Sequence, residues 1–142
     1  MIEIDSMRSQ CPLANGLEVL GDKWTLLIIR DLMFTNRREF GHFLQAGEGI
    51  STNILAERLD RLQCYGLISK APHPHHGKKY VYTLTDKGLK LAPVIFEFTL
   101  WASDEIDNTF VPPVILKMLK NDRDGLLRAI KERRPLVTLD LG

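Results

Sequence analysis

Hydrophobic residues recur at helical spacing through the first half of the chain, and this spacing predicts four helices. The first begins at Pro12, whose fixed φ suits the first helical position, and ends at Gly21. The second, about Trp24 to Met33, is apolar on nearly every side, as is typical of a helix at the centre of a core. The third and fourth, over about residues 38–45 and 52–65, carry apolar residues on one side only.

A short turn that contains glycine joins the third and fourth predicted helices. Ser51 stands directly before the fourth, where its hydroxyl can accept a hydrogen bond from a free N–H of the first turn. Leu55, Leu59 and Leu62 form the inner stripe of this helix, and Gly66 follows it. Two such helices joined by a short turn predict a helix-turn-helix.

The pattern then changes from helical to extended. The segments Leu67–Lys70 and Lys79–Leu84 are rich in β-branched and aromatic residues and predict two strands. The loop between them contains two prolines, three histidines and a glycine. A hairpin directly after a helix-turn-helix is a wing. The expected fold class is therefore mainly α with a small β-hairpin wing, a winged helix-turn-helix.

A further helix is expected after the wing, with a kink or a restart at Pro93. Apolar residues from Val94 to about Ile106 form a stripe that is wider than a small neighbouring domain requires. A surplus apolar face suggests a second copy of the chain, so we expect a homodimer formed through terminal helices. The alternative is that residues 108–142 fold back over the stripe. The residues expected in the dimer interface are Phe98, Trp101 and Ala102.

Length and composition are those of one folded domain: 142 residues, 44% hydrophobic and 26% charged. We expect residues 1–10 to form a flexible arm, residues 11–107 the winged domain with its dimerisation helix, and residues 108–142 a helical extension whose role the sequence does not indicate. No apolar run is long enough to span a membrane, and the first residues lack the apolar segment of a secretory signal. Two cysteines far apart form no disulfide framework. These features predict a cytoplasmic protein.

Positive charge is concentrated in the middle of the chain. Residues 51–90 contain seven Lys or Arg against three Asp or Glu, together with three of the four histidines. On a chain with a net charge of only +1, such a stripe indicates an anionic partner or, alternatively, an ordinary solvated surface. The major groove of DNA is about 12 Å wide and admits one α-helix, so we expect the helix from Thr52 to enter it.

The residue types on and around this helix suit DNA recognition. Asn53 can pair with adenine, and Thr52 can contact the thymine methyl group. Cations on the wing can reach phosphates or the minor groove. The residues expected to contact operator DNA are Lys23, Arg37, Arg38, Ser51, Thr52, Asn53, Arg58, Arg61, Lys78 and Lys79. The alternative function is a winged-helix protein-interaction module that does not bind DNA.

Several short stretches, in order and at fixed spacing, make the chain resemble the HxlR-type winged helix-turn-helix transcriptional regulators of bacteria. The resemblance covers about residues 11–103 and implies a homodimeric DNA-binding regulator, often responsive to electrophiles, oxidants or aldehydes. The matching stretches are Cys11-Pro12, Gly21-Asp22-Lys23-Trp24, residues 48–55, Arg58-Leu59, Gly66-Leu67-Ile68, residues 82–88, Pro93 and Trp101.

The two cysteines have different expected roles. Cys11 directly precedes a predicted helix, whose positive N-terminal dipole favours a reactive thiolate, and the resembling family often has a redox-sensing cysteine just before this proline. We treat Cys11 as a sensor candidate for an oxidant or small-molecule effector, the alternative being an inert cysteine near the dimer interface. Cys64 is expected to serve packing.

The sequence indicates no catalytic or metal chemistry. His73, His75 and His76 are metal-ligating residue types, but they lie on one loop without a cysteine or carboxylate at ligand spacing. We expect them to contact DNA instead. No metalloprotease, nucleophile-elbow, phosphate-loop or dinucleotide-binding motif is present, so we expect neither an enzyme nor a bound cofactor.

Overall fold

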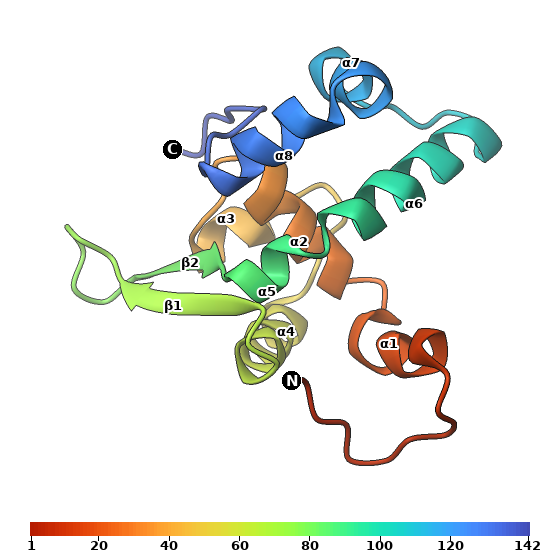
Figure 1. The fold of residues 1–142 in the computed structure, drawn as a ribbon. Helices are drawn as coiled ribbons and strands as arrows, with labels where there is room; N and C mark the ends of the chain where they lie inside the picture. Colours follow the sequence, from red (N-terminus) through yellow and green to blue (C-terminus); the bar gives the residue numbers. More distant parts are fainter.

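The computed structural model describes residues 1–142, and a helix-turn-helix with a projecting hairpin forms its centre (Figure 1). The predicted order of elements is confirmed. The elements are α1 (Pro12–Leu20), α2 (Thr25–Phe34), α3 (Phe40–Leu44), α4 (Thr52–Cys64), β1 (Ile68–Pro72), β2 (Tyr80–Leu84), α5 (Asp86–Leu89), α6 (Ala92–Glu105), α7 (Pro113–Asn121) and α8 (Arg123–Lys131).

Two boundaries show how local chemistry determines helix ends. α3 begins two residues later than predicted because Glu39 forms a capping box with His42, which places the helix start at Phe40. At Pro93 the prediction of a restart is confirmed. α5 ends at Leu89 and α6 begins at Ala92, so the proline stands in a first turn, where its missing N–H costs nothing.

The core lies behind α4, and the predicted inner stripe forms part of it. Leu55, Leu59 and Leu62 are almost completely buried, as are Ile29 of α2 and Phe43 of α3. These side chains belong to one continuous apolar cluster, whose burial is the main driving force for folding. α4 is therefore held from one side only, and its opposite side remains available.

The wing is an antiparallel pair of strands that projects from the body (Figure 1). Ile68 pairs with Leu84 at its base, where both side chains are buried. The ring of Tyr82 packs edge-on against Phe43 of α3, with centroids 6.3 Å apart. The pairing ends at Pro72 and Tyr80, which are exposed. The base is fixed by the core, and the tip reaches into solvent.

The C-terminal residues fold back onto the helix-turn-helix. α7 and α8 contribute apolar side chains to the common core, and the segment after α8 lies against the end of α2 (Figure 1). The backbone N–H groups of Leu136 and Val137 both donate to the carbonyl of Phe34 at 2.9 Å. The side chain of Asn36 donates to the carbonyl of Leu139 at 3.0 Å and accepts from its N–H at 2.8 Å.

The first ten residues form no helix or strand, and Ile2 and Ile4 pack partly against the core. None of the helices combines the length and the apolar character needed to cross a lipid bilayer.

Candidate DNA-binding surface

α4 presents a polar face at its N-terminal end. Ser51 caps the helix, since its hydroxyl accepts a hydrogen bond from the N–H of Ile54 at 3.2 Å. Gly49, in the turn before it, has a φ of +74°, which glycine adopts without steric cost. Because the leucine stripe faces the core, the opposite face is exposed. It carries Thr52, Asn53, Ala56, Glu57 and Asp60.

The partly buried carboxylate of Asp22 joins α4 to the start of α2. Asp22 accepts hydrogen bonds from the backbone N–H groups of Trp24 at 2.8 Å and Thr25 at 3.0 Å, and from the Thr25 hydroxyl. Nε of Arg58 on α4 donates to the same carboxylate at 3.0 Å. Burial would raise the pKa of Asp22, but these donors outweigh it and lower the pKa to about 2. Arg58, predicted to contact DNA, is thus part of an ion pair that positions α4.

Arg37 and Arg38 point into the protein. Nε of Arg37 donates to the carbonyl of His42 at 3.1 Å, and its Nη1 lies 3.4 Å from the carboxylate of Asp31. Arg38 donates to the carbonyl oxygens of Thr35 at 2.9 Å and of Arg37. Burial, together with the charge of Arg133, lowers the pKa of Arg38. Both arginines therefore hold the segment between α2 and α3 in place.

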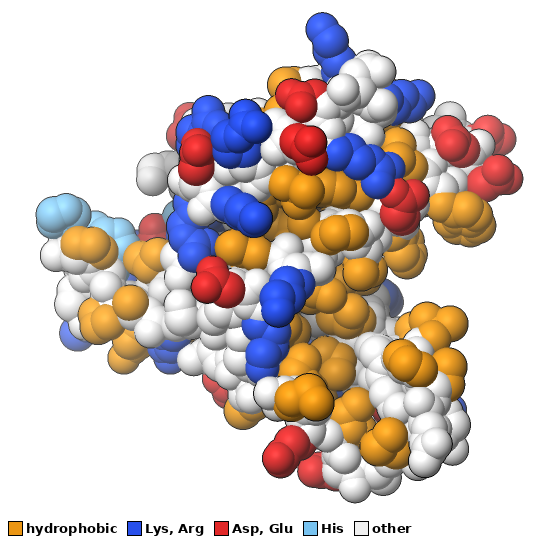
Figure 2. All heavy atoms as spheres, in the orientation of Figure 1, with side chains coloured by type: hydrophobic (Ala, Val, Ile, Leu, Met, Phe, Trp, Pro, Cys, Tyr) orange, Lys and Arg blue, Asp and Glu red, His pale blue; other side chains and the backbone are white.

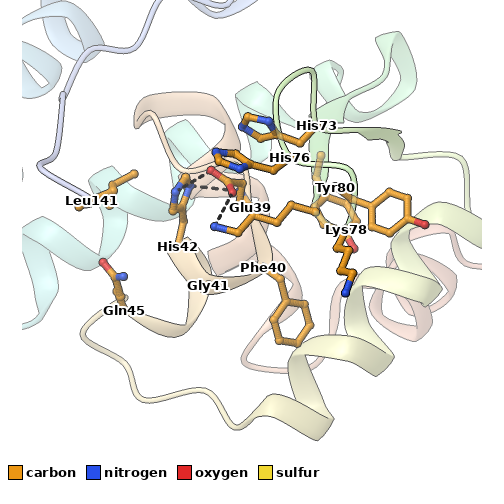
Figure 3. A pocket seen from close by; sticks show the side chains of 13 residues that line it. Glu39, Phe40, Gly41, His42, Gln45, His73, His76, Lys78, Tyr80 and Leu141 are labelled. Carbon is orange, nitrogen blue, oxygen red and sulfur yellow. Dashed lines mark hydrogen bonds and ion pairs between the residues drawn. The ribbon is translucent and has the colours of Figure 1, made fainter.

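The wing is connected to α3 through Glu39 (Figure 3). Its carboxylate lies 3.0 Å from Nε2 of His42 and 3.8 Å from Nζ of Lys79. Nδ1 of His42 accepts hydrogen bonds from the backbone N–H groups of Arg38 at 3.1 Å and Glu39 at 3.2 Å. This geometry requires a neutral ring with its proton on Nε2. Burial first, then the charges of Lys79, Arg37 and Arg38, lower the pKa of His42, although Glu39 opposes them.

Of the other cations, Lys78 and Lys23 remain open, whereas Arg61 is paired. Lys78 is exposed at the wing tip and forms no ion pair, and Lys23 is exposed with its Nζ 5.2 Å from the ring centre of Trp24. Arg61 lies 3.9 Å from Glu57 on α4, and it borders the same hollow as the first residues of the chain. Asp60 lies near Tyr82 of the wing, whose pKa is raised by burial and then by this negative charge.

The residues predicted to contact DNA thus fall into two groups. Some have side chains that are free to meet a partner, and others are held by contacts within the chain. The free group is Lys23, Thr52, Asn53 and Lys78, while Arg37, Arg38, Ser51, Arg58, Arg61 and Lys79 are engaged. Sequence reasoning missed Asp22 and Glu39 as positioning residues. A capping signal was present for both, because each stands three residues before the residue that it contacts in a helix first turn.

An apolar surface lies on the side of the molecule formed by α1 and α6 (Figure 2). Phe98 and Trp101 on α6 are 61% and 62% exposed, while Ala102 is half-buried. α1 adds Leu13 and Leu17, both exposed, and buries only Val19. The C-terminal extension packs on the other side of α6, where Phe96 is buried. The fold-back considered from the sequence does occur, but it leaves Phe98 and Trp101 uncovered.

Both cysteines are free and exposed. Cys11 stands at the N-cap of α1, next to Pro12 at the first helical position, as predicted. The expectation that Cys64 serves packing is wrong. Position 64 is two residues beyond Leu62 of the inner stripe, and this spacing turns it to the outer side of α4.

The helix-turn-helix, its capped and exposed second helix and the following hairpin define a winged helix-turn-helix protein. Comparison with known sequences agrees: the sequence model of the family described as HxlR-like helix-turn-helix matches residues 19–110. The chain belongs to this family.

Relatives and solved structures are of the same class. The chain is 32% identical over 102 residues to the uncharacterised HTH-type transcriptional regulator YvaP of Bacillus subtilis, covering 71% of this chain and 94% of YvaP. It is 35% identical over 95 residues to the HTH-type transcriptional regulator YodB of the same organism, covering 66% and 84%. The reduced form of YodB superimposes with a TM-score of 0.57 at 31% identity, covering 72% of this chain and all of YodB. The structure of PA1607 matches with a TM-score of 0.65 at 36% identity over 73% of each chain.

Proposed function

We propose that this protein is a sequence-specific transcriptional regulator that binds operator DNA as a homodimer, with α4 in the major groove. The observation that carries the proposal is the outer face of α4. Thr52 and Asn53 are exposed in its first turn, and their side chains make no hydrogen bond within the chain. In helix-turn-helix proteins, N-terminal residues of the second helix contact base edges.

The surroundings of α4 support the same function. Asp22, through Arg58, holds α4 against α2, and Glu39 holds the wing against α3, so the two elements present a defined relative position. Lys78 at the wing tip has no acidic partner. A fixed reading helix beside a free cation suits a partner that combines base edges with phosphates.

The alternative is a winged helix that binds another protein through this face. Salt dependence distinguishes the two. Affinity for duplex DNA, measured by fluorescence anisotropy with fragments selected by the full-length protein from random duplexes, should fall by about 0.9 log units per log unit of salt for each phosphate contacted. A flat dependence, or no binding at low ionic strength, would contradict DNA binding.

Base readout is tested by Asn53→Ala. Loss of a bidentate contact should cost about 1–3 kcal/mol of discrimination at one base pair and little on random duplex. Asn121→Ala, at the exposed end of α7, is the matched control and should change neither. If Asn53→Ala weakens selected and random duplexes equally, α4 does not read the groove as proposed.

We assign dimerisation to the exposed side of α1 and α6, around Phe98, Trp101 and Ala102. α1 buries a single side chain against its own chain, so a second copy would supply the missing contacts. Two reading helices in such a dimer should lie about 34 Å apart, one turn of DNA. Trp101→Ala should shift the mass in solution towards the monomer, while Phe110→Ala, at an even more exposed aromatic residue on the loop after α6, should not. An unchanged mass for Trp101→Ala would place the interface elsewhere.

Cys11 is the proposed redox or electrophile sensor. It is exposed at the N-cap of α1, on an element assigned to the dimer interface, so a chemical change there can alter the spacing of the two reading helices. The relative YodB has solved structures in diamide-treated and quinone-bound forms. Treatment with a quinone, which adds to a single thiol and needs no second cysteine, should change operator affinity in the wild type and in Cys64→Ser but not in Cys11→Ser. A response that persists in Cys11→Ser would exclude this role.

A further inference from the structure

A cavity of about 330 Å³ lies between the helix-turn-helix and the C-terminal extension. One wall comes from α2 and the turn before α4, and the other comes from α6, the loop after it, α7 and the segment after α8. The part of the chain that matches the family ends at residue 110. Ile115, Leu119, Val137 and Leu139 therefore add a wall that lies outside the matched region.

Part of the cavity lining is aromatic and apolar. Phe34 and Phe96 stand with ring centroids 6.3 Å apart and planes inclined by 35°, and both are buried. Phe110 borders the cavity from the loop after α6 and is highly exposed. The paired rings leave no room for a third ring between them, so a flat apolar group in the cavity would pack against their cavity-facing side and against Phe110.

Another part of the lining is charged. Asp31, only 4% exposed, accepts from Nε and Nη2 of Arg30 at 3.1 and 2.9 Å and lies 3.4 Å from Nη1 of Arg37. Arg30 also pairs with Glu48. In this network, Nη1 of Arg30 and Nη2 of Arg37 make no hydrogen bond within the chain. Two guanidinium groups with unused donors thus border an aromatic cavity.

We infer that this cavity is an effector site for a small aromatic carboxylate, with its ring against the lining formed by Phe34, Phe96 and Phe110 and its carboxylate at Arg30 and Arg37. Guanidinium donors favour a carboxylate because its two oxygens match their geometry. The volume is at the lower end of the range for small-molecule sites, so the ligand has one or two rings.

Charge balance indicates which contact the ligand replaces. Asp31 and Glu48 already neutralise the two arginines, so an added carboxylate must displace one of them. The Glu48 side chain is 37% exposed, so it can turn into water when the ligand replaces it. Asp31 is buried, so loss of an arginine partner would leave its negative charge uncompensated inside the protein. The ligand therefore competes with Glu48 for Arg30.

Displacement of Glu48 would act on the reading helix. Glu48 lies in the turn between α3 and α4, three residues before the cap Ser51. Its pairing with Arg30 ties this turn to α2, so loss of the pair loosens the start of α4. The ligand should then weaken operator binding, and operator DNA should weaken ligand binding by the same factor. This regulatory step rests on the proposed DNA-binding function, whereas occupation of the cavity does not.

Ligand binding is tested first, without DNA. Benzoate and 2-naphthoate are titrated into the full-length protein by isothermal calorimetry, with benzamide and acetate as probes that lack the charge or the ring. At least one aromatic acid should bind saturably, and both controls should bind roughly tenfold or more weakly. If neither acid binds, or if a control binds equally well, the site is not the one inferred.

Variants locate the binding. Thr99→Phe narrows the cavity and Arg30→Gln removes one donor group, and each should weaken the bound acid roughly tenfold. Arg123→Gln, which removes an arginine paired with Glu97 outside the cavity, should leave it unchanged. Thermal melts check that each variant folds. If Arg30→Gln does not fold, the affinity of Thr99→Phe for the acid decides whether the acid binds in this cavity. Unchanged affinity in a folded Thr99→Phe would refute the site.

The coupling is tested last, on selected duplex DNA with and without saturating acid. Weaker DNA binding with the acid supports the regulatory step, and the effect should vanish in Glu48→Gln. Ligand binding that leaves DNA affinity unchanged refutes the coupling alone. Ligand binding to a protein that binds no DNA refutes the proposed function and leaves the cavity site standing.

Discussion

The segment between α2 and α3 and the tip of the wing are both rich in cations, yet the structure uses them in opposite ways. Arg37 and Arg38 are engaged with buried or backbone acceptors, and their side chains stabilise the fold. Lys78 is exposed and has no acidic partner. Lys79 is exposed, and its Nζ lies 3.8 Å from the carboxylate of Glu39. The two regions differ in whether the fold places hydrogen-bond acceptors beside their cations. This difference cannot be recognised by counting the basic residues in each region.

Arginine and lysine are suited to these different uses. A guanidinium can satisfy several acceptors at once in a fixed plane, as Arg37 does with Asp31 and the carbonyl of His42. An ammonium on a flexible stem stays hydrated and can follow a phosphate. A basic pair in a helix-turn-helix sequence therefore indicates DNA contact only when no acceptor inside the protein competes for it.

The sharpest test of this comparison is Arg37→Met against Lys78→Met. Removing Arg37 leaves the buried carboxylate of Asp31 with Arg30 alone, and burial already raises the pKa of Asp31. We expect the free energy of unfolding to fall by about 3 kcal/mol, measured by urea denaturation. Lys78→Met should stay within about 0.5 kcal/mol of the wild type. Equal stabilities would mean that Arg37 is not a structural residue.

The second test concerns Asp22, the partner of Arg58. Its pKa is about 2 in the fold against 3.8 for an unperturbed aspartate, so its ionised form stabilises the native state. Asp22→Asn should lower the free energy of unfolding by about 2 kcal/mol at pH 7. This stabilisation is fully present above pH 3.8 and is lost as the pH falls through about 2, so the difference between the two proteins should narrow there. Asp60→Asn, exposed on α4, is the control, and a similar loss in it would contradict the assignment.

The architecture could be predicted from the sequence because it depends on local patterns. The stripe of Leu55, Leu59 and Leu62 required one buried face, and the period change after Gly66 required a hairpin. Ser51 was identified as a cap from its position alone. Each of these features involves neighbours within a few residues.

The engagement of Arg58 and Lys79 could not be predicted, because their partners are distant in sequence. Arg58 meets Asp22 across 36 positions, and Asn36 meets Leu139 across 103. Only the assembled core brings such pairs together. For the same reason the sequence indicated a helical extension over residues 108–142 but not that its last segment closes a cavity against α2.

The third test addresses the free cation on the DNA side. If Lys78 contacts one phosphate, Lys78→Gln should weaken binding to all duplexes alike and reduce the slope of log affinity against log salt by about one unit. Lys117→Gln, an exposed lysine on α7, should leave the slope unchanged. A loss that depends on the DNA sequence would show that Lys78 reads bases and would redefine the role of the wing.

The smallest expected effect extends the comparison to histidine. His42 is held between Glu39 and two backbone N–H groups, and burial lowers its pKa below 6.5, whereas His75 is exposed on the wing loop. Because the unfolded chain binds a proton more readily than the fold does, the stabilisation by neutral His42 is present above pH 6.5 and is lost as the pH falls through the lowered folded pKa. His42→Gln should flatten the dependence of the free energy of unfolding on pH just below pH 6.5, and His75→Gln on the wing loop is the control variant. An identical dependence in the two variants would mean that protonation of His42 does not destabilise the fold, and the separation between engaged and free groups would then hold for the arginines and lysines only.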